Sequence, residues 1–220
     1  MKNKIISAAE AVAPVRDGDF LMVGGFVECG YPGLLVQALT DASSAKDLTV
    51  LSNDTVTTDG NFTPILLSGR ISRVYASYIG LNAVTSKMHL DGLVTLIPQG
   101  TLAEKVRMGG AGIGGFLTPT GVGTVVEKGK TKITLNCRDY LLEESLTGDV
   151  GFVRATIADK AGNLHLRGTT KNFNSLIPAA CRYVVAEAET IVEVGELDPE
   201  LVNVPGILVD AIVKAGENVG

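Results

Sequence analysis

The stretch DGDFLMVGGFVECGYP, residues 17–32, predicts the fold of the chain around it. Its apolar run, Phe20–Val23, stops abruptly at Gly24 and Gly25, as a buried strand that leads into a loop does. After the loop, Pro32 suits the first position of a helix, and apolar residues then recur at helical spacing. We therefore expect a strand, a glycine loop and a helix, an arrangement in which backbone amides can approach a ligand.

Similar alternations of apolar runs and helical segments continue through the first half of the chain. They predict an α/β fold with a mostly parallel sheet flanked by helices. Further strands are expected at residues 48–52, 71–79 and 93–97, helices at residues 7–12 and 102–108, and a loop or irregular helix at residues 82–92.

Two amide side chains follow predicted strands at the positions where they end. Asn53 comes directly after the strand at residues 48–52, and Gln99 lies at the apex of a turn after the strand at residues 93–97. Ligands of open parallel sheets bind at the carboxyl ends of the strands, so both residues are site candidates. An asparagine that caps a turn and a surface glutamine are the alternatives.

A segment with seven glycines, GGAGIGGFLTPTGVGT, covers residues 109–124. It is not a Walker A loop, because no Gly-Lys-Ser/Thr follows. It is not a dinucleotide-binding motif either, because no βαβ unit with an acidic residue surrounds it. Such a segment either packs tightly against a flat ligand or a partner chain, or is mobile until one binds. The residues favour neither alternative.

The second half of the chain predicts antiparallel hairpins added to the parallel sheet. Turn residues separate short strands, and a short helix follows the sequence KNFN. The expected hairpins join residues 132–135 to 140–143 and 151–157 to 164–167, a strand covers residues 183–188, and a helix covers residues 207–214.

Composition excludes several classes of function. A net charge of −5, a pI near 5.1 and scattered lysines and arginines give no support to binding of nucleic acid or membranes. The first residues do not resemble a secretory signal, and no apolar run approaches the ~18 residues of a membrane helix. The chain has three cysteines, Cys29, Cys137 and Cys181, and this odd number argues against a set of disulfides. Their spacing does not fit a metal site, so we expect free thiols, no metal site and a cytoplasmic protein.

Residues 17–32 resemble the N-terminal signature of the family I coenzyme A transferases. Three later stretches resemble the same family, and the match is closest to the α subunits of acetate or butyrate:acetoacetate CoA-transferases. Those stretches are PQGTLAEKVRMGGAGIGGFLTPTGVGT (98–124), AGN (161–163) and GTTKNFN (168–174). The resemblance implies one α-subunit domain over residues 1–220, with the fold of the NagB/RpiA/CoA transferase-like group.

The resemblance also implies a reaction in which a glutamate attacks an acyl-CoA, forms a mixed anhydride and then holds CoA as a thioester. That glutamate belongs to a Ser-Glu-Asn-Gly motif of a β subunit, with which this chain would form a heterodimer or heterotetramer. The chain lacks the motif, and Glu217-Asn218 matches it for two letters only. We therefore expect no nucleophile in this chain, and CoA as a substrate rather than a permanently bound cofactor.

Site residues are carried over by motif. Asn53 and Gln99 are expected around the thioester carbonyl, where donors stabilise a developing oxyanion. The segment expected to contact CoA comprises Gly24, Gly25, Phe26, Val27, Glu28, Cys29 and Gly30. Glu28 departs from the family pattern, which has a neutral or small residue at that position.

Two other classes of function remain as alternatives. A non-catalytic sugar-phosphate or nucleotide-binding module on the same fold would need clustered lysines and arginines at the strand ends, which the sequence lacks. A nucleotide-binding oxidoreductase domain could use Asp54 for the ribose, but the spacing after Gly24 does not fit a dinucleotide fold.

Overall fold

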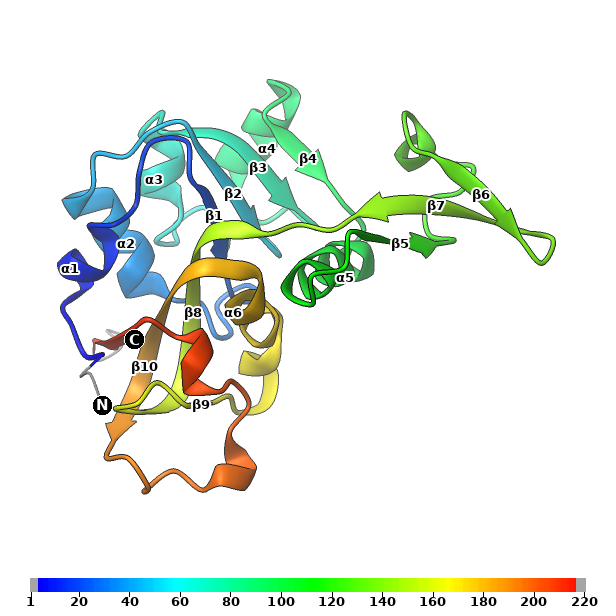
Figure 1. The fold of residues 1–220 in the computed structure, drawn as a ribbon. Coiled ribbons are helices and arrows are strands. Elements are labelled where there is room, and N and C mark those ends of the chain that lie inside the picture. Colours follow the sequence, from blue (N-terminus) through cyan, green and yellow to red (C-terminus); the bar gives the residue numbers. More distant parts are fainter. Residues whose placement is uncertain (1–3, 217–220) are drawn as a thin grey trace.

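The computed structural model describes residues 4–216, and its main element is a parallel sheet. The strand order is β11-β10-β8-β1-β2-β3-β4, and β9 pairs antiparallel with β8 at one end (Figure 1). The strands are β1 (Phe20–Val23), β2 (Leu48–Ser52), β3 (Ile71–Ala76), β4 (Val94–Leu96), β8 (Gly148–Asp159), β9 (Leu164–His165), β10 (Cys181–Val192) and β11 (Ala211–Lys214).

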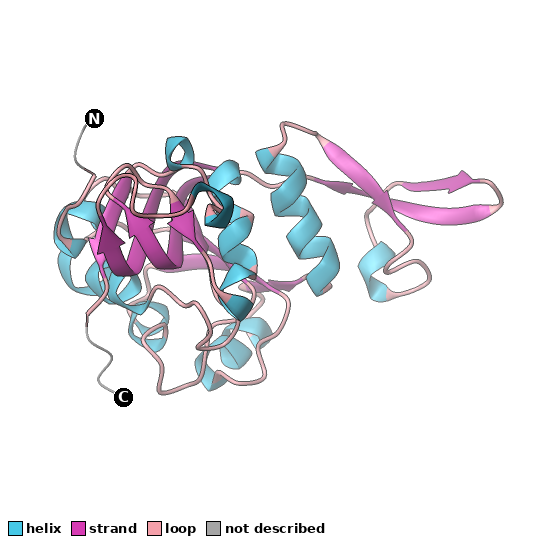
Figure 2. Cartoon of the chain, turned by 90° about the horizontal axis from the view of Figure 1, so that it is seen from below, coloured by secondary structure: helices cyan, strands magenta, loops and turns pink. Residues whose placement is uncertain are grey.

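Helices cover both faces of this sheet (Figure 2). Consecutive residues of a strand point to opposite faces, so Leu21 and Val23 pack in one core cluster while Met22 packs in the other. The first cluster lies under α1 (Ala8–Val12), α2 (Gly33–Ala42), α3 (Thr63–Leu67) and α4 (Ala83–Leu90), and the second under α5 (Gln99–Gly110) and α6 (Ile177–Ala180). Burial on both faces explains why the strands are continuous apolar runs.

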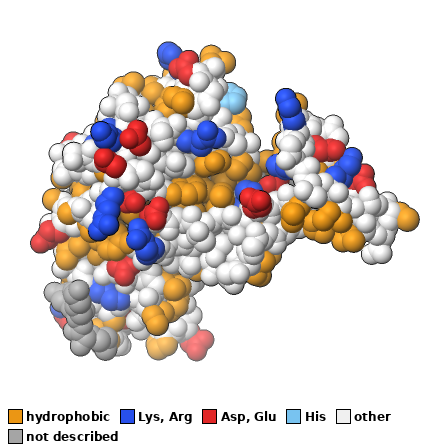
Figure 3. Space-filling view, turned by 45° about the horizontal axis from the view of Figure 1, so that its top comes forward, with side chains coloured by type: hydrophobic (Ala, Val, Ile, Leu, Met, Phe, Trp, Pro, Cys, Tyr) orange, Lys and Arg blue, Asp and Glu red, His pale blue; other side chains and the backbone are white. Residues whose placement is uncertain are grey.

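A three-stranded antiparallel arm projects from this body (Figures 1 and 2). It consists of β5 (Gly115–Thr118), β6 (Lys132–Leu135) and β7 (Arg138–Glu144), in the order β5-β7-β6. Buried Glu143 joins the arm to α5, because its carboxylate accepts hydrogen bonds from Lys105 and Lys130. Hydrophobic side chains gather on the arm and on the part of the body beside it (Figure 3).

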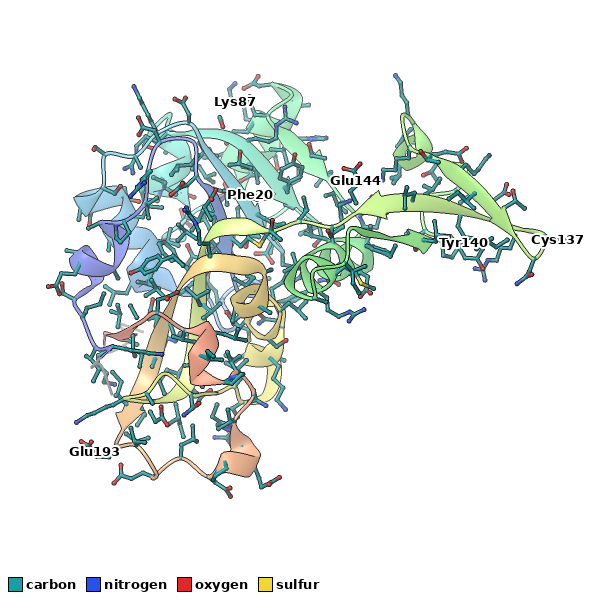
Figure 4. The ribbon with its side chains drawn as sticks, viewed as in Figure 1. Phe20, Lys87, Cys137, Tyr140, Glu144 and Glu193 are labelled. Carbon is teal, nitrogen blue, oxygen red and sulfur yellow. The ribbon has the colours of Figure 1, made fainter. Side chains whose placement is uncertain are left out.

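Short 3₁₀ turns complete the chain at Val125–Glu127, Gly168–Lys171, Phe173–Ser175, Pro199–Leu201 and Gly206–Leu208. Cys137 lies at the tip of the arm (Figure 4). It shares the β6–β7 turn with Asn136, and both have positive φ, as tight hairpin turns require. No helix among the described residues is both long and apolar enough to cross a membrane.

Most of the predicted elements are confirmed. Helix α1 begins after Ser7, which forms the expected capping box with Glu10. The strands after it, the first hairpin and the short helix after KNFN are present, although β3 ends at Ala76 and Pro32 caps α2 instead of occupying its first position. The second hairpin is shorter than predicted, because β9 pairs with only two residues at the end of β8.

Five predictions need correction. Residues 83–90 form a regular helix, because Asn82 accepts hydrogen bonds from the first-turn amides. Helix α5 begins at Gln99 instead of residue 102, directly after the helix-starting Pro98. The predicted helix over residues 207–214 is wrong, because residues 211–214 form β11, which pairs in parallel with β10, and only residues 206–208 form a 3₁₀ turn. The glycine segment 109–124 contains β5, and β8, β10 and β11 extend the parallel sheet.

Candidate functional site

The structure brings Asn53 and Gln99 into direct contact at the carboxyl ends of β2 and β4, which lie on either side of β3 in the sheet. The Gln99 Nε2 donates a hydrogen bond to the Asn53 Oδ1 over 2.6 Å. Ser77, which follows β3 between the other two, donates to the same oxygen over 2.7 Å. Asn53 is 2% exposed, whereas Gln99 is exposed at the start of α5. A buried amide therefore holds an exposed one at the surface of the sheet edge.

Asp54 links this amide pair to the loop of residues 24–30, which follows β1. Its Oδ2 accepts hydrogen bonds from the Asn53 Nδ2 over 2.7 Å and from the backbone amide of Val27 over 2.9 Å. The loop and the amide pair are thus neighbours at one edge of the sheet. They come from strands β1, β2 and β4, as the strand-end argument predicts.

Within the loop, Phe26 and Cys29 exchange two backbone hydrogen bonds of 3.0 Å each. Val27, inside this tight turn, has a φ of +51°, which is costly for a β-branched residue. The Phe26 side chain is 48% exposed, and Glu28 and Cys29 are exposed as well. The turn therefore presents its side chains outward, where a ligand or a partner chain can reach them.

Two asparagines from the C-terminal motif fix this loop. Asn172 accepts from the amide of Gly25 over 3.1 Å and donates to the carbonyl of Cys29 over 3.0 Å. Asn174 is fully buried and donates to the carbonyl of Gly30 over 2.8 Å. The loop conformation thus depends on residues more than 140 positions away.

Close packing against Asn174 also explains two of the loop glycines. A Cβ at Gly24 would lie 1.8 Å from the Asn174 Oδ1, and one at Gly30 would lie 2.8 Å from its Nδ2. Gly30 additionally has a φ of +65°. Larger side chains at these two positions would displace Asn174.

A polar pocket of about 540 Å³ lies on the other side of the loop, above the N-terminus of α2. Glu28 lines it together with a buried ion pair, in which Arg154 bonds to Glu187. Burial raises the pKa of Glu187, although Arg154 and the first amides of α2 oppose this effect. Tyr31 also lines the pocket, and its hydroxyl has no hydrogen-bond partner among the described residues.

Asn172 and Asn174 were missed as site residues in the sequence, although the stretch GTTKNFN is part of the resemblance. No sequence pattern identifies Arg154 and Glu187 as site residues, because each lies inside an otherwise apolar strand. Glu217 and Asn218, the two-letter match to the nucleophile motif, lie outside the described residues. Within residues 4–216, no three His, Cys, Asp or Glu side chains are grouped so that they could hold a metal ion.

Comparison with known proteins finds close relatives along nearly the whole chain. The alpha chain of acetate CoA-transferase from Escherichia coli K12 is 44% identical, covering 99% of this chain and 100% of the relative. The Clostridium acetobutylicum acetoacetyl-CoA:acetate/butyrate CoA transferase alpha subunit is 42% identical, covering 97% and 99%. The alpha chain of a probable coenzyme A transferase from Bacillus subtilis is 44% identical, covering 97% and 94%.

Solved structures share the fold at lower identity. An acyl-CoA transferase of Escherichia coli O157:H7 superposes with a TM-score of 0.86 at 22% identity, over 97% of this chain and 47% of that one. Glutaconate coenzyme A-transferase of Acidaminococcus fermentans gives a TM-score of 0.82 at 20% identity, over 96% and 75%. The family model described as Coenzyme A transferase matches residues 5–215. From its sequence and its fold, the chain belongs to the coenzyme A transferase family.

Proposed function

We propose that this chain is the α subunit of a heteromeric short-chain CoA-transferase, which moves CoA between acetate or butyrate and acetoacetate-type acids. Its similarity to relatives named as alpha subunits extends from end to end. We further propose that residues 1–220 act as one domain, that CoA is a substrate and no cofactor is bound permanently, and that the protein works in the cytoplasm.

The contact between Gln99 and Asn53 is the observation that carries this proposal. A glutamate from the β subunit first attacks the thioester carbon and expels the thiolate of CoA, which leaves a mixed anhydride. The thiolate then attacks the glutamyl carbonyl and releases the first acid, and the reverse sequence loads the second acid. Negative charge develops on the carbonyl oxygen in each step, and the exposed Gln99 amide is placed to donate to it.

Loop residues 24–30 would contact CoA beside this amide pair. Glu28, Glu187 and Glu189 line the pocket on the far side of the loop, and Arg154 is the one cation among the described residues that line it. Phosphate groups of CoA would be repelled there, so we propose that the loop contacts the uncharged pantetheine part.

The test is the rate of CoA transfer from acetoacetyl-CoA to acetate, for this chain alone and for this chain co-expressed with the β subunit. Activity only in the pair is expected, and turnover by the chain alone would contradict the proposal. In the pair, Gln99→Met keeps the length of the side chain and its neutral charge but removes its N–H donors. We expect kcat to fall about 10²-fold, as for loss of one oxyanion donor, whereas Glu104→Gln, on the same helix, should stay near the wild type.

A further inference from the structure

Asp54 occupies a buried position between the two parts of the candidate site. It lies two residues after the end of β2, is 6% exposed, and has both carboxylate oxygens engaged. The Oδ2 accepts from the Val27 amide and the Asn53 side chain, and the Oδ1 accepts from the Val56 amide over 3.0 Å. Only the Val56 contact is the local turn that an aspartate after a strand commonly makes.

Both backbone amides that Asp54 binds belong to strained residues. Val27 has a φ of +51° and Val56 a φ of +54°, and both are β-branched. Such conformations are costly and persist only where the surrounding structure holds them. The Asp54 carboxylate therefore holds two strained turns, one at Val27 in the loop and one at Val56, shortly after Asn53.

Asp54 also decides which way the two amide side chains point. A carboxylate can only accept hydrogen bonds, so Asn53 must turn its NH₂ toward Asp54 and its Oδ1 away. This oxygen can then only accept, so Gln99 must turn its own NH₂ toward Asn53. One Nε2 hydrogen of Gln99 is used in that bond, and the second remains available to another acceptor on this exposed side chain. We call this series of directed hydrogen bonds, from Gln99 through Asn53 to Asp54, the relay.

We propose that Asp54 is a positioning residue, which fixes the direction of the Asn53–Gln99 hydrogen bond so that Gln99 presents an N–H donor to the thioester carbonyl oxygen. The role of the donor rests on the proposed function, whereas the relay itself does not. Ser77 does not fix this direction by itself, because its hydroxyl donates to the Asn53 Oδ1 but can equally accept from an NH₂. Without the carboxylate, Asn53 can therefore rotate its amide by half a turn, and Gln99 can then present either its oxygen or its nitrogen.

A spectroscopic measurement tests the relay on this chain alone. The side-chain NH₂ signals of Asn53 and Gln99 are assigned in ¹⁵N-labelled protein by their loss in Asn53→Ala and Gln99→Ala. In Asp54→Ala we expect both pairs of signals to shift, although Gln99 has no hydrogen bond to Asp54. A shift confined to Asn53 would overturn the relay.

A matched control is available in Asp159, another buried carboxylate that accepts two backbone amides and one asparagine side chain. Asp159→Ala should leave the Gln99 signals in place. Asp54→Asn is a second control, because it can keep an oxygen toward Asn53 and Val27 and lose only the Val56 contact. Its Gln99 signals should therefore stay close to those of the wild type.

The wild-type protein decides the direction of the relay if Asp54→Ala does not fold. In ¹⁵N,¹³C-labelled protein, a scalar coupling through the hydrogen bond should join the Gln99 Nε2 to the Asn53 Cγ. A coupling from the Asn53 Nδ2 to the Gln99 Cδ would show the opposite direction and overturn the proposal.

Kinetics of the complex with the β subunit test the consequence for catalysis. Asp54→Ala and Gln99→Ala should each lower kcat about 10–10²-fold, and the double variant should be within about threefold of the worse single one, because both remove the same donor. Asp54→Asn should recover part of the loss, and Asp159→Ala should change kcat less than about threefold. Multiplying effects in the double variant would overturn the proposal while the transferase assignment stands. If the wild-type complex with the β subunit is inactive, the proposed transferase function is refuted instead. The NMR measurement would still show whether Asp54 orients the Asn53 and Gln99 amides.

Discussion

Replacement of Gly24 by alanine should destabilise the protein through Asn174. The new Cβ would lie 1.8 Å from the Asn174 Oδ1 and 2.7 Å from its Cγ, so the buried asparagine must move. Asn174 bonds to the Arg154 amide at 3.0 Å, the Gly30 carbonyl at 2.8 Å and the Thr170 carbonyl at 2.9 Å. A buried group left without its partner costs about 1–3 kcal/mol, so loss of two of these bonds should lower the free energy of unfolding by about 3 kcal/mol.

Urea unfolding followed by circular dichroism measures this loss, and thermal unfolding should show a Tm lower by about 6–12 °C for a chain of this size. Gly114→Ala is the matched control, because its Cβ would meet no atom within 4 Å. Asn174→Ala combined with Gly24→Ala should be no less stable than Asn174→Ala alone, since the clash is gone. Equal stability of Gly24→Ala and Gly114→Ala would refute the reasoning.

Two further predictions concern titratable side chains. Burial alone would raise the pKa of Glu143, but the hydrogen bonds from Lys105 and Lys130 prevail and lower it below the ordinary value of 4.5. The contribution of the ionised Glu143 to the free energy of unfolding is therefore complete above its unfolded-state pKa and is lost as pH falls through its folded-state pKa. The wild type should thus lose more stability than Glu143→Gln between about pH 5 and pH 3, as measured by urea unfolding at each pH. Burial raises the pKa of the Cys181 thiol to about 12, so a thiol reagent in mildly alkaline buffer should modify the two exposed cysteines quickly and Cys181 slowly, and equal rates would contradict its burial.

Elements decided by a few adjacent residues could be predicted from the sequence. The capping box of Ser7 and Glu10, the strand Phe20–Val23 and the hairpin around Asn136 all depend on local chemistry. The approach of Asn53 and Gln99, 46 residues apart, could also be predicted, because the carboxyl ends of all strands in a parallel sheet lie at the same edge.

Features that depend on distant partners could not be predicted in this way. The residues of β11 are compatible with a helix as well as a strand, and the open edge of β10 decides between them. The contacts of Asn172 and Asn174 with the loop join segments more than 140 residues apart, and no periodicity in either segment reports them. The same holds for the Arg154–Glu187 pair, which lies inside two apolar strands.

The central claim is that this chain supplies the oxyanion donor while a partner chain supplies the nucleophile. The most direct measurement is the intact mass of both chains after the complex with the β subunit is incubated with acetoacetyl-CoA and quenched in acid. The expected result is a CoA adduct found only on the β subunit, removed by hydroxylamine as a thioester would be. A CoA adduct on this chain would contradict the account.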